Sequence, residues 1–146
     1  MSPDDDLVLF RRVRASLRRR PVRDFARTLR DTVAAEREFV CLITDDRELR
    51  RLNRQFRGAD HATDVLSFPS TDRESIGEIA ISADRATVQA RMFGHSVADE
   101  IRILMLHGVL HLLGMNHETD QGRMARAEAR WRRKLQLPAS LIARAS

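Results

Sequence analysis

Apolar residues recur every three to four positions along much of the chain, which is the period of an amphipathic helix. In VRDFARTLRDTV (22 to 33) this pattern follows Pro21, a residue that can open a helix. A second helix is predicted after Asp45, because a glutamate three residues later completes the pattern of a capping box. Gly58 can end this helix in a left-handed turn, which places Arg57 in the last turn.

Three more helices are expected in the second half of the chain. Ser82 can cap a helix over residues 83 to 92. Ser96, with an aspartate three residues later, marks the start of a helix that reaches to about Leu113. A last helix is predicted because four residues recur at helical spacing, with the tryptophan on its inner face. These residues are Met124, Glu128, Trp131 and Leu135.

Four shorter segments have the pattern of β-strands. FVCLIT (39 to 44) is a continuous apolar run typical of a buried strand, and IGEIAIS (76 to 82) alternates. DVLSFP (64 to 69) is stopped by its proline, and LVLF (7 to 10), which could continue through RRV, is the fourth candidate. We therefore expect one α+β domain over residues 1 to 146, in which a mixed sheet of about four strands packs with about five helices.

The composition fits a globular protein. The 146 residues are 42% hydrophobic and 32% charged, and no apolar run approaches the roughly 18 residues of a membrane span. The acidic N-terminus lacks the positive and apolar regions of a signal peptide, so we expect a cytoplasmic protein that does not act on a membrane. The single cysteine, Cys41, excludes an internal disulfide and is expected to fill the core.

The net charge of +5 comes almost entirely from arginine, since Lys134 is the only lysine. The excess is concentrated in RRVRASLRRR (11 to 20) and RWRRK (130 to 134). Arginine suits phosphate because its planar guanidinium donates paired hydrogen bonds, which makes nucleic acid a reasonable partner. An arginine-rich composition, in which the charged side chains on the surface contact only water, explains the net charge equally well.

The segment HGVLHLLGMNH (107 to 117) places three histidines in an apolar stretch. His107 and His111 are four residues apart and project from one face of a helix. Gly114 can turn the chain back and bring His117 over the same face. Three imidazoles with a fourth position left for water or substrate are the ligand set of a catalytic zinc site.

A lone HxxxH pair more often consists of ordinary core histidines, but the third histidine beyond a glycine favours a metal site. The full pattern HxxxHxxGxxH is the ligand scaffold of the metzincin proteases, so we expect a zincin-like metal helix. Those proteases need glutamate directly after the first histidine, and Gly108 stands there instead. This argues for another kind of hydrolase or a structural zinc. A phosphodiester substrate would suit the metal and the basic surface.

HGVLHLLGMNH also resembles the HGxLHLxGxxH signature of the YbeY family of bacterial endoribonucleases. LNRQFRGADHATDVLSFP (52 to 69) and IGEIAIS resemble two further blocks of that family in the same order. The resemblance implies a zinc-dependent, single-strand-specific endoribonuclease. It would act in rRNA maturation, notably at the 3′ end of the small-subunit rRNA, and in ribosome quality control. The implied partners are single-stranded RNA, ribosomal RNA and the small ribosomal subunit, without DNA.

By position, His107, His111 and His117 match the zinc ligands of the family, and Arg57 matches its functional arginine. A guanidinium near the metal can hold a phosphate and stabilise charge that develops on it. Without the resemblance, Arg57 would be a cation favoured at a helix C-terminus.

The chain departs from the family pattern at Met115 and Asn116, where tyrosine and aspartate are usual, and at Glu78, where aspartate is common. The general base is not assigned, and the alternative function is a zinc-stabilised RNA- or ribosome-binding assembly factor with little catalysis. A metalloprotease is disfavoured because the glutamate base is absent. Three residues could support the site or accept a proton, although two of them could equally serve a turn or a strand: Asp64, Ser67 and Glu118.

Overall fold

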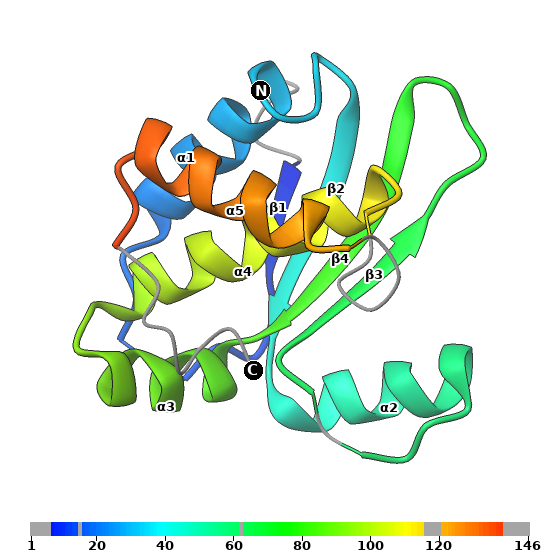
Figure 1. Cartoon of the computed structure of the whole chain (residues 1–146). Helices are drawn as coiled ribbons and strands as arrows, with labels where there is room; N and C mark the ends of the chain where they lie inside the picture. The colour runs from blue at the N-terminus through cyan, green and yellow to red at the C-terminus, as the bar shows by residue number, and fades with distance from the viewer. Residues whose placement is uncertain (1–6, 15, 62, 116–120, 139–146) are drawn as a thin grey trace.

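The computed structural model describes residues 7–14, 16–61, 63–115 and 121–138. Within them the chain forms four strands and five helices (Figure 1). The strands are β1 (Val8–Phe10), β2 (Glu38–Thr44), β3 (Val65–Pro69) and β4 (Ser75–Ser82). The helices are α1 (Arg19–Asp31), α2 (Asp46–Arg57), α3 (Ala83–Phe93), α4 (Val97–Leu112) and α5 (Arg123–Lys134). The predicted α+β class is confirmed.

The strands form one mixed sheet in the order β1-β2-β4-β3. β1 is parallel to β2, β2 is parallel to β4, and β3 runs antiparallel to β4. Helices α1, α3, α4 and α5 lie on one side of the sheet and α2 lies on the other (Figure 1). The sheet therefore separates the two elements that carry the predicted site residues, α2 and α4.

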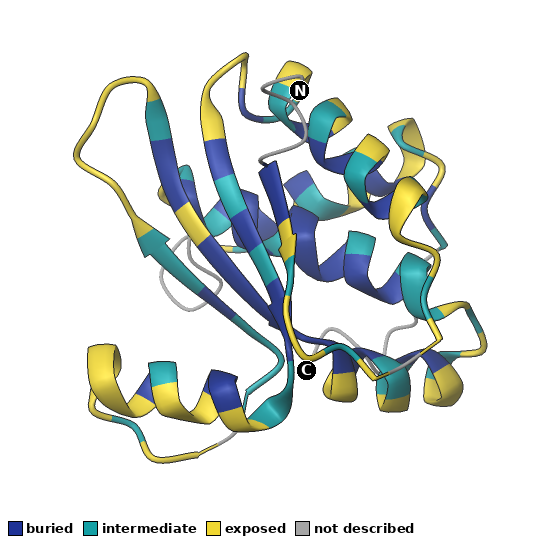
Figure 2. Ribbon diagram, turned by 180° about the vertical axis from the view of Figure 1, so that it is seen from behind, coloured by how far each residue is buried: buried dark blue, intermediate teal, exposed yellow. Residues whose placement is uncertain are grey.

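Two separate groups of apolar side chains hold these layers together. The main core joins the sheet to α1, α3, α4 and α5, and α4 is buried along most of its length (Figure 2). Beneath α2 a smaller cluster of buried residues contains Leu49, Leu66 and Ala80, with Leu52 and Phe68 packed against it. The split follows from the pleat, because successive side chains of β3 and β4 point to opposite faces.

Helix α4 approaches β3 and β4 closely because two positions carry no side chain. A Cβ atom on Gly108 would lie 2.9 to 3.2 Å from side-chain carbons of Ile79 on β4. On Gly77 of β4 it would lie 2.3 Å from the carbonyl oxygen of Phe68 and 2.9 Å from a Leu112 methyl group. The Ser67 hydroxyl of β3 donates to the Gly108 carbonyl oxygen at 3.2 Å. The backbone of each glycine is thus in close contact with a side chain of the facing element.

The predicted helix caps are confirmed. The side chains of Asp45, Ser82 and Ser96 each accept a hydrogen bond from the backbone N–H three residues later. Helix α1 starts two residues before Pro21, which the first turn tolerates because it needs no N–H donor there. The strand at 7–10 does not continue through RRV, because Arg12 turns the chain with a φ of 59°.

The burial of the remaining apolar elements follows the sequence expectation. Cys41 is fully buried in β2, and this burial raises the pKa of its thiol. Trp131 is partly buried and packs against the main core from α5. Among the helices of the described residues, none is both long and apolar enough to cross a membrane.

Gly77→Ala should destabilise the protein much more than Gly58→Ala. Both glycines have positive φ, 137° and 68°, but only Gly77 is close to other backbone atoms. We expect a loss of about 3 kcal/mol or more at Gly77, from backbone strain plus overpacking, and about 1 to 2 kcal/mol at Gly58. Urea denaturation of both variants measures the difference. Equal losses would contradict the role given to the close contact.

Candidate metal centre

The two histidines of α4 interrupt an otherwise buried surface. From Ile103 to Leu112 every residue is buried except His107 and His111, which are half-buried. Their rings lie edge to face, with centroids 4.7 Å apart and an interplanar angle of 68°. The predicted placement of this pair on one face of a helix is therefore confirmed.

The end of α4 turns as the sequence predicts. Gly114 has a φ of 94°, its N–H donates to the His111 carbonyl oxygen at 2.9 Å, and Met115 N–H donates to the Leu110 carbonyl oxygen at 3.1 Å. These bonds close the helix and redirect the chain. The segment that follows, with Asn116, His117 and Glu118, lies outside the described residues. The convergence of the third histidine on the pair stays a prediction.

Helix α5 supplies a carboxylate to this pair. Nδ1 of His107 lies 2.5 Å from Oε1 of Glu128, and the two side chains are 26% and 14% exposed. The place of Glu128 in the apolar series of α5 indicates that its carboxylate needs a partner, although it does not identify His107 as that partner. A charged group on the inner side of a helix is expected to have a partner.

The donor chemistry of this cluster fits zinc. Imidazole nitrogen is a common zinc ligand, and metal-binding histidines usually donate their second ring N–H to a carboxylate or carbonyl. Within the described residues no group of three metal-ligating side chains is found, and two of the three predicted ligands are among those residues. The zinc ion and its three-histidine ligand set therefore remain proposals.

The structure gives a packing reason for glycine after the first histidine. Position 108 faces Ile79, and the space between α4 and β4 is too small even for an added Cβ without a shift of that buried side chain. A glutamate there would have to displace part of the core. The base used by metzincin proteases thus has no room at this position.

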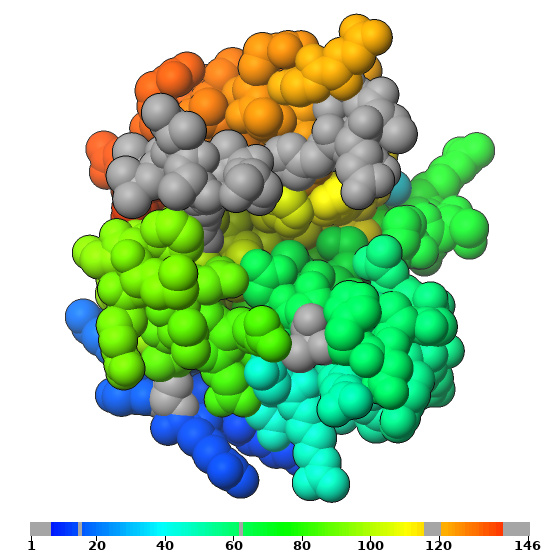
Figure 3. Space-filling model, turned by 60° about the horizontal axis from the view of Figure 1, so that its bottom comes forward, coloured from blue at the N-terminus to red at the C-terminus, as the bar shows by residue number. Residues whose placement is uncertain are grey.

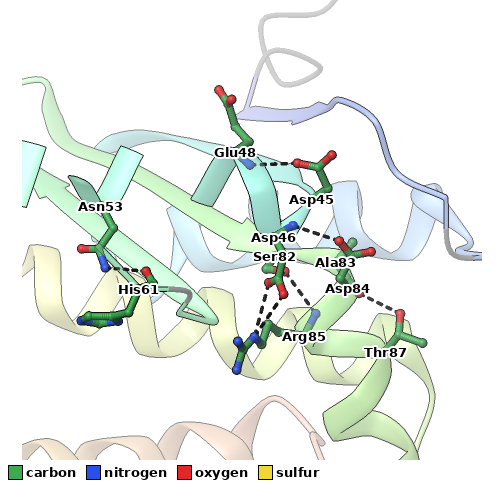
Figure 4. A network of polar contacts seen from close by, with 10 residues as sticks. All are labelled: Asp45, Asp46, Glu48, Asn53, His61, Ser82, Ala83, Asp84, Arg85 and Thr87. Carbon is green, nitrogen blue, oxygen red and sulfur yellow. Dashed lines mark hydrogen bonds and ion pairs between the residues drawn. The ribbon is translucent and has the colours of Figure 1, made fainter. Parts of the chain in front are cut away.

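Arg57 is the last residue of α2 and is exposed. Gly58 ends the helix in a left-handed conformation, and the amide of buried Asn53 donates to the His61 carbonyl oxygen at 3.1 Å (Figure 4). These contacts fix the turn that follows Arg57. Within the described residues its guanidinium makes no hydrogen bond or ion pair, so it is available to an anion.

The start of α2 is tied to the start of α3. Ser82 donates its hydroxyl to Asp46 at 2.7 Å, and Asp46 N–H donates to the Asp84 carboxylate at 2.9 Å (Figure 4). Nε of Arg85 lies 3.3 Å from both oxygens of Asp46. This network anchors the helix that carries Arg57.

Arg57 and the histidine pair come from opposite sides of the sheet, and no contact joins them within the described residues. The edge strand β3 touches both helices, since Leu66 packs with α2 and Ser67 bonds to α4. In Figure 3, part of α4 (yellow) is visible on the surface between α5 (orange) and the green segments of α2 and α3.

The other candidate residues have mainly structural contacts. Ser67 joins β3 to α4, and the carbonyl oxygen of Asp64 accepts a hydrogen bond from Ser82 N–H at 2.9 Å. Glu78 is exposed and pairs with Phe68, on the α2 side of the sheet. A mainly apolar groove on that side is lined by residues that include Leu9 and Phe56. Glu78 therefore faces this groove rather than the histidine pair.

The basic runs are partly structural. The guanidinium group of Arg19, in the first run, lies over the Phe10 ring, at 4.7 Å from its centroid. Arg12 lies 4.0 Å from Glu48. Arg132, in the second run, is buried. Such contacts reduce the number of arginines that can serve a polyanion.

The comparisons with known proteins point to one family. The model of the family described as Endoribonuclease YbeY matches residues 14–136. The chain is 59% identical to the Endoribonuclease YbeY of Solibacter usitatus, over 98% of this chain and 97% of that protein. It is 52% identical to the Endoribonuclease YbeY of Nautilia profundicola, over 75% and 80%. The solution structure of TM1509 from Thermotoga maritima superimposes with a TM-score of 0.58 at 26% identity, over 84% and 86%.

These matches agree with the class that the sequence motifs indicate, an RNA endonuclease with an α+β fold. The chain belongs to the Endoribonuclease YbeY family. The resemblance inferred from HGVLHLLGMNH is thereby confirmed.

Glu48 makes the first turn of α2 sensitive to pH. Nε and Nη2 of Arg51 donate to its carboxylate at 3.0 and 2.9 Å. These hydrogen bonds lower the pKa of Glu48, while burial opposes the shift. A lowered pKa stabilises the folded state at neutral pH, and this stabilisation is lost as the pH falls through the folded-state pKa.

Glu48→Gln should therefore be less stable than the wild type at neutral pH, with a difference that shrinks under acid conditions. The free energy of unfolding of both proteins, measured by urea denaturation from about pH 7 to about pH 3, tests this expectation. A difference that stays constant over that range would show that the charge on Glu48 does not stabilise α2.

Proposed function

We propose that this protein is a zinc-dependent endoribonuclease that cleaves single-stranded RNA. Its place would be rRNA maturation, at the 3′ end of the small-subunit rRNA, and ribosome quality control, with ribosomal RNA and the small ribosomal subunit as partners. The observation that carries this proposal is the half-buried pair of His107 and His111 on the central helix of a YbeY-family chain.

In this proposal His107, His111 and His117 hold one zinc ion through neutral imidazole nitrogens. When bound, zinc supplies a Lewis acid that polarises a phosphoryl oxygen. Arg57 binds a phosphate of the same strand through paired hydrogen bonds, which orients the scissile bond and stabilises negative charge on it. The side chains of His107 and His111 are themselves half-buried, which limits the access of bulk water to them.

Arg57→Ala should lower the rate of RNA cleavage by about 10²-fold to 10³-fold, the usual effect of removing one charge-stabilising donor. The assay is cleavage of a single-stranded fragment of the small-subunit rRNA 3′ end, with zinc content determined for each protein. Arg54→Ala is the matched control, because it removes an exposed arginine from the same turn of α2. We expect the control to cut at the wild-type rate and all three proteins to hold zinc.

Each outcome of this comparison has a distinct meaning. Equal rates in Arg57→Ala and Arg54→Ala would remove the catalytic role of Arg57. If the wild type holds zinc and does not cut, the assembly-factor function replaces the enzyme. Zinc-free wild type that still cuts would overturn the metal dependence.

The exposed arginines of the first basic run provide a separate test of RNA contact. Replacing Arg11, Arg18 and Arg20 with glutamine should reduce the slope of log affinity against log salt by about 2, since each neutralised phosphate of a single strand contributes about 0.7. Fluorescence anisotropy with a labelled single-stranded RNA over a salt series measures the slope. An unchanged slope would show that this run contacts only solvent.

A further inference from the structure

The carboxylate of Glu128 distinguishes the two ring nitrogens of His107. Helix α5 packs on the main core through buried Met124 and Ala127, and Glu128 follows on the same side of the helix. Its Oε1 lies 2.5 Å from Nδ1 of His107. An ionised carboxylate can only accept a hydrogen bond, so a neutral His107 donates from Nδ1 and carries its lone pair on Nε2.

We infer that Glu128 is the positioning residue of the metal centre, setting the tautomer and ring orientation of His107 so that Nε2 is the atom offered to zinc. This inference rests on the proposed function, because it takes His107 to be a zinc ligand. A carboxylate behind a ligating histidine raises its basicity and prevents ring rotation, and loss of such a group typically weakens metal affinity by about 10-fold to 100-fold.

Another histidine–glutamate pair among the described residues, His95 with Glu100, is an example of a structural contact. Glu100 is fully buried, with one oxygen 2.6 Å from the Gln89 amide nitrogen and the other 2.7 Å from Nε2 of His95. That carboxylate is enclosed and serves the packing of α3 on α4. Glu128, by contrast, contacts a histidine whose side chain is 26% exposed and which lies one helical turn from His111. Partly exposed ion pairs of this kind contribute little to stability.

The test is the zinc affinity of Glu128→Gln, measured by competition with a chromophoric chelator. The substitution keeps the size of the side chain, and Glu78→Gln is the control, because it removes the same charge from the opposite face of the sheet. We expect zinc binding about 10-fold to 100-fold weaker in Glu128→Gln and within twofold of the wild type in the control. The urea midpoint of metal-free Glu128→Gln should stay close to that of the wild type.

A second readout does not require metal. In the metal-free wild type, ¹⁵N chemical shifts of neutral His107 should show the hydrogen on Nδ1, and in Glu128→Gln both tautomers should appear, because an amide can donate or accept. Unchanged tautomer and unchanged zinc affinity in Glu128→Gln would overturn the inference. So would a large loss of metal-free stability with normal affinity, which would assign Glu128 to packing alone. If the wild type binds no zinc, the proposed function fails, and the tautomer still decides the role of Glu128.

Discussion

The close packing of α4 against β3 and β4 is the constraint on which the rest of the structure depends. Because Gly77 and Gly108 carry no side chains, Leu112 and Ile79 of the facing elements can pack directly on their backbone, and the Ser67 hydroxyl adds a hydrogen bond to Gly108. With Gly108 directed at β4, His107 and the histidine one turn later lie on a neighbouring face of α4, to one side of this contact, where both are only half-buried. The rotation of one helix about its axis thus decides which of its residues are available for chemistry.

The same constraint explains why supporting groups come from other elements. A helix buried along most of its length cannot provide a polar neighbour for each histidine without breaking the core. The carboxylate that meets His107 is therefore supplied by α5, and the exposed guanidinium of Arg57 comes from α2, across β3. The candidate residues thus come from three helices, and β3 lies between α2 and α4.

Local patterns in the sequence were sufficient to predict the elements and part of the site. Capping residues such as Asp45 and Ser96 marked helix starts, and helical geometry placed His107 beside His111. The contact of His107 with Glu128 could not be predicted, since it joins residues 21 positions apart in different helices. Nor could the sequence show that Arg57 lies on the other side of the sheet, because the order β1-β2-β4-β3 arises from tertiary packing.

The separation of the two apolar clusters gives the halves of the molecule different local stabilities. The cluster beneath α2 contains only a few buried residues, whereas α4 belongs to the main core. Opening of α2 therefore exposes much less apolar surface than global unfolding, and it needs a correspondingly smaller free energy. The position of Arg57 can consequently change while that of His107 and His111 stays fixed, because the two ends of the candidate site belong to different apolar clusters.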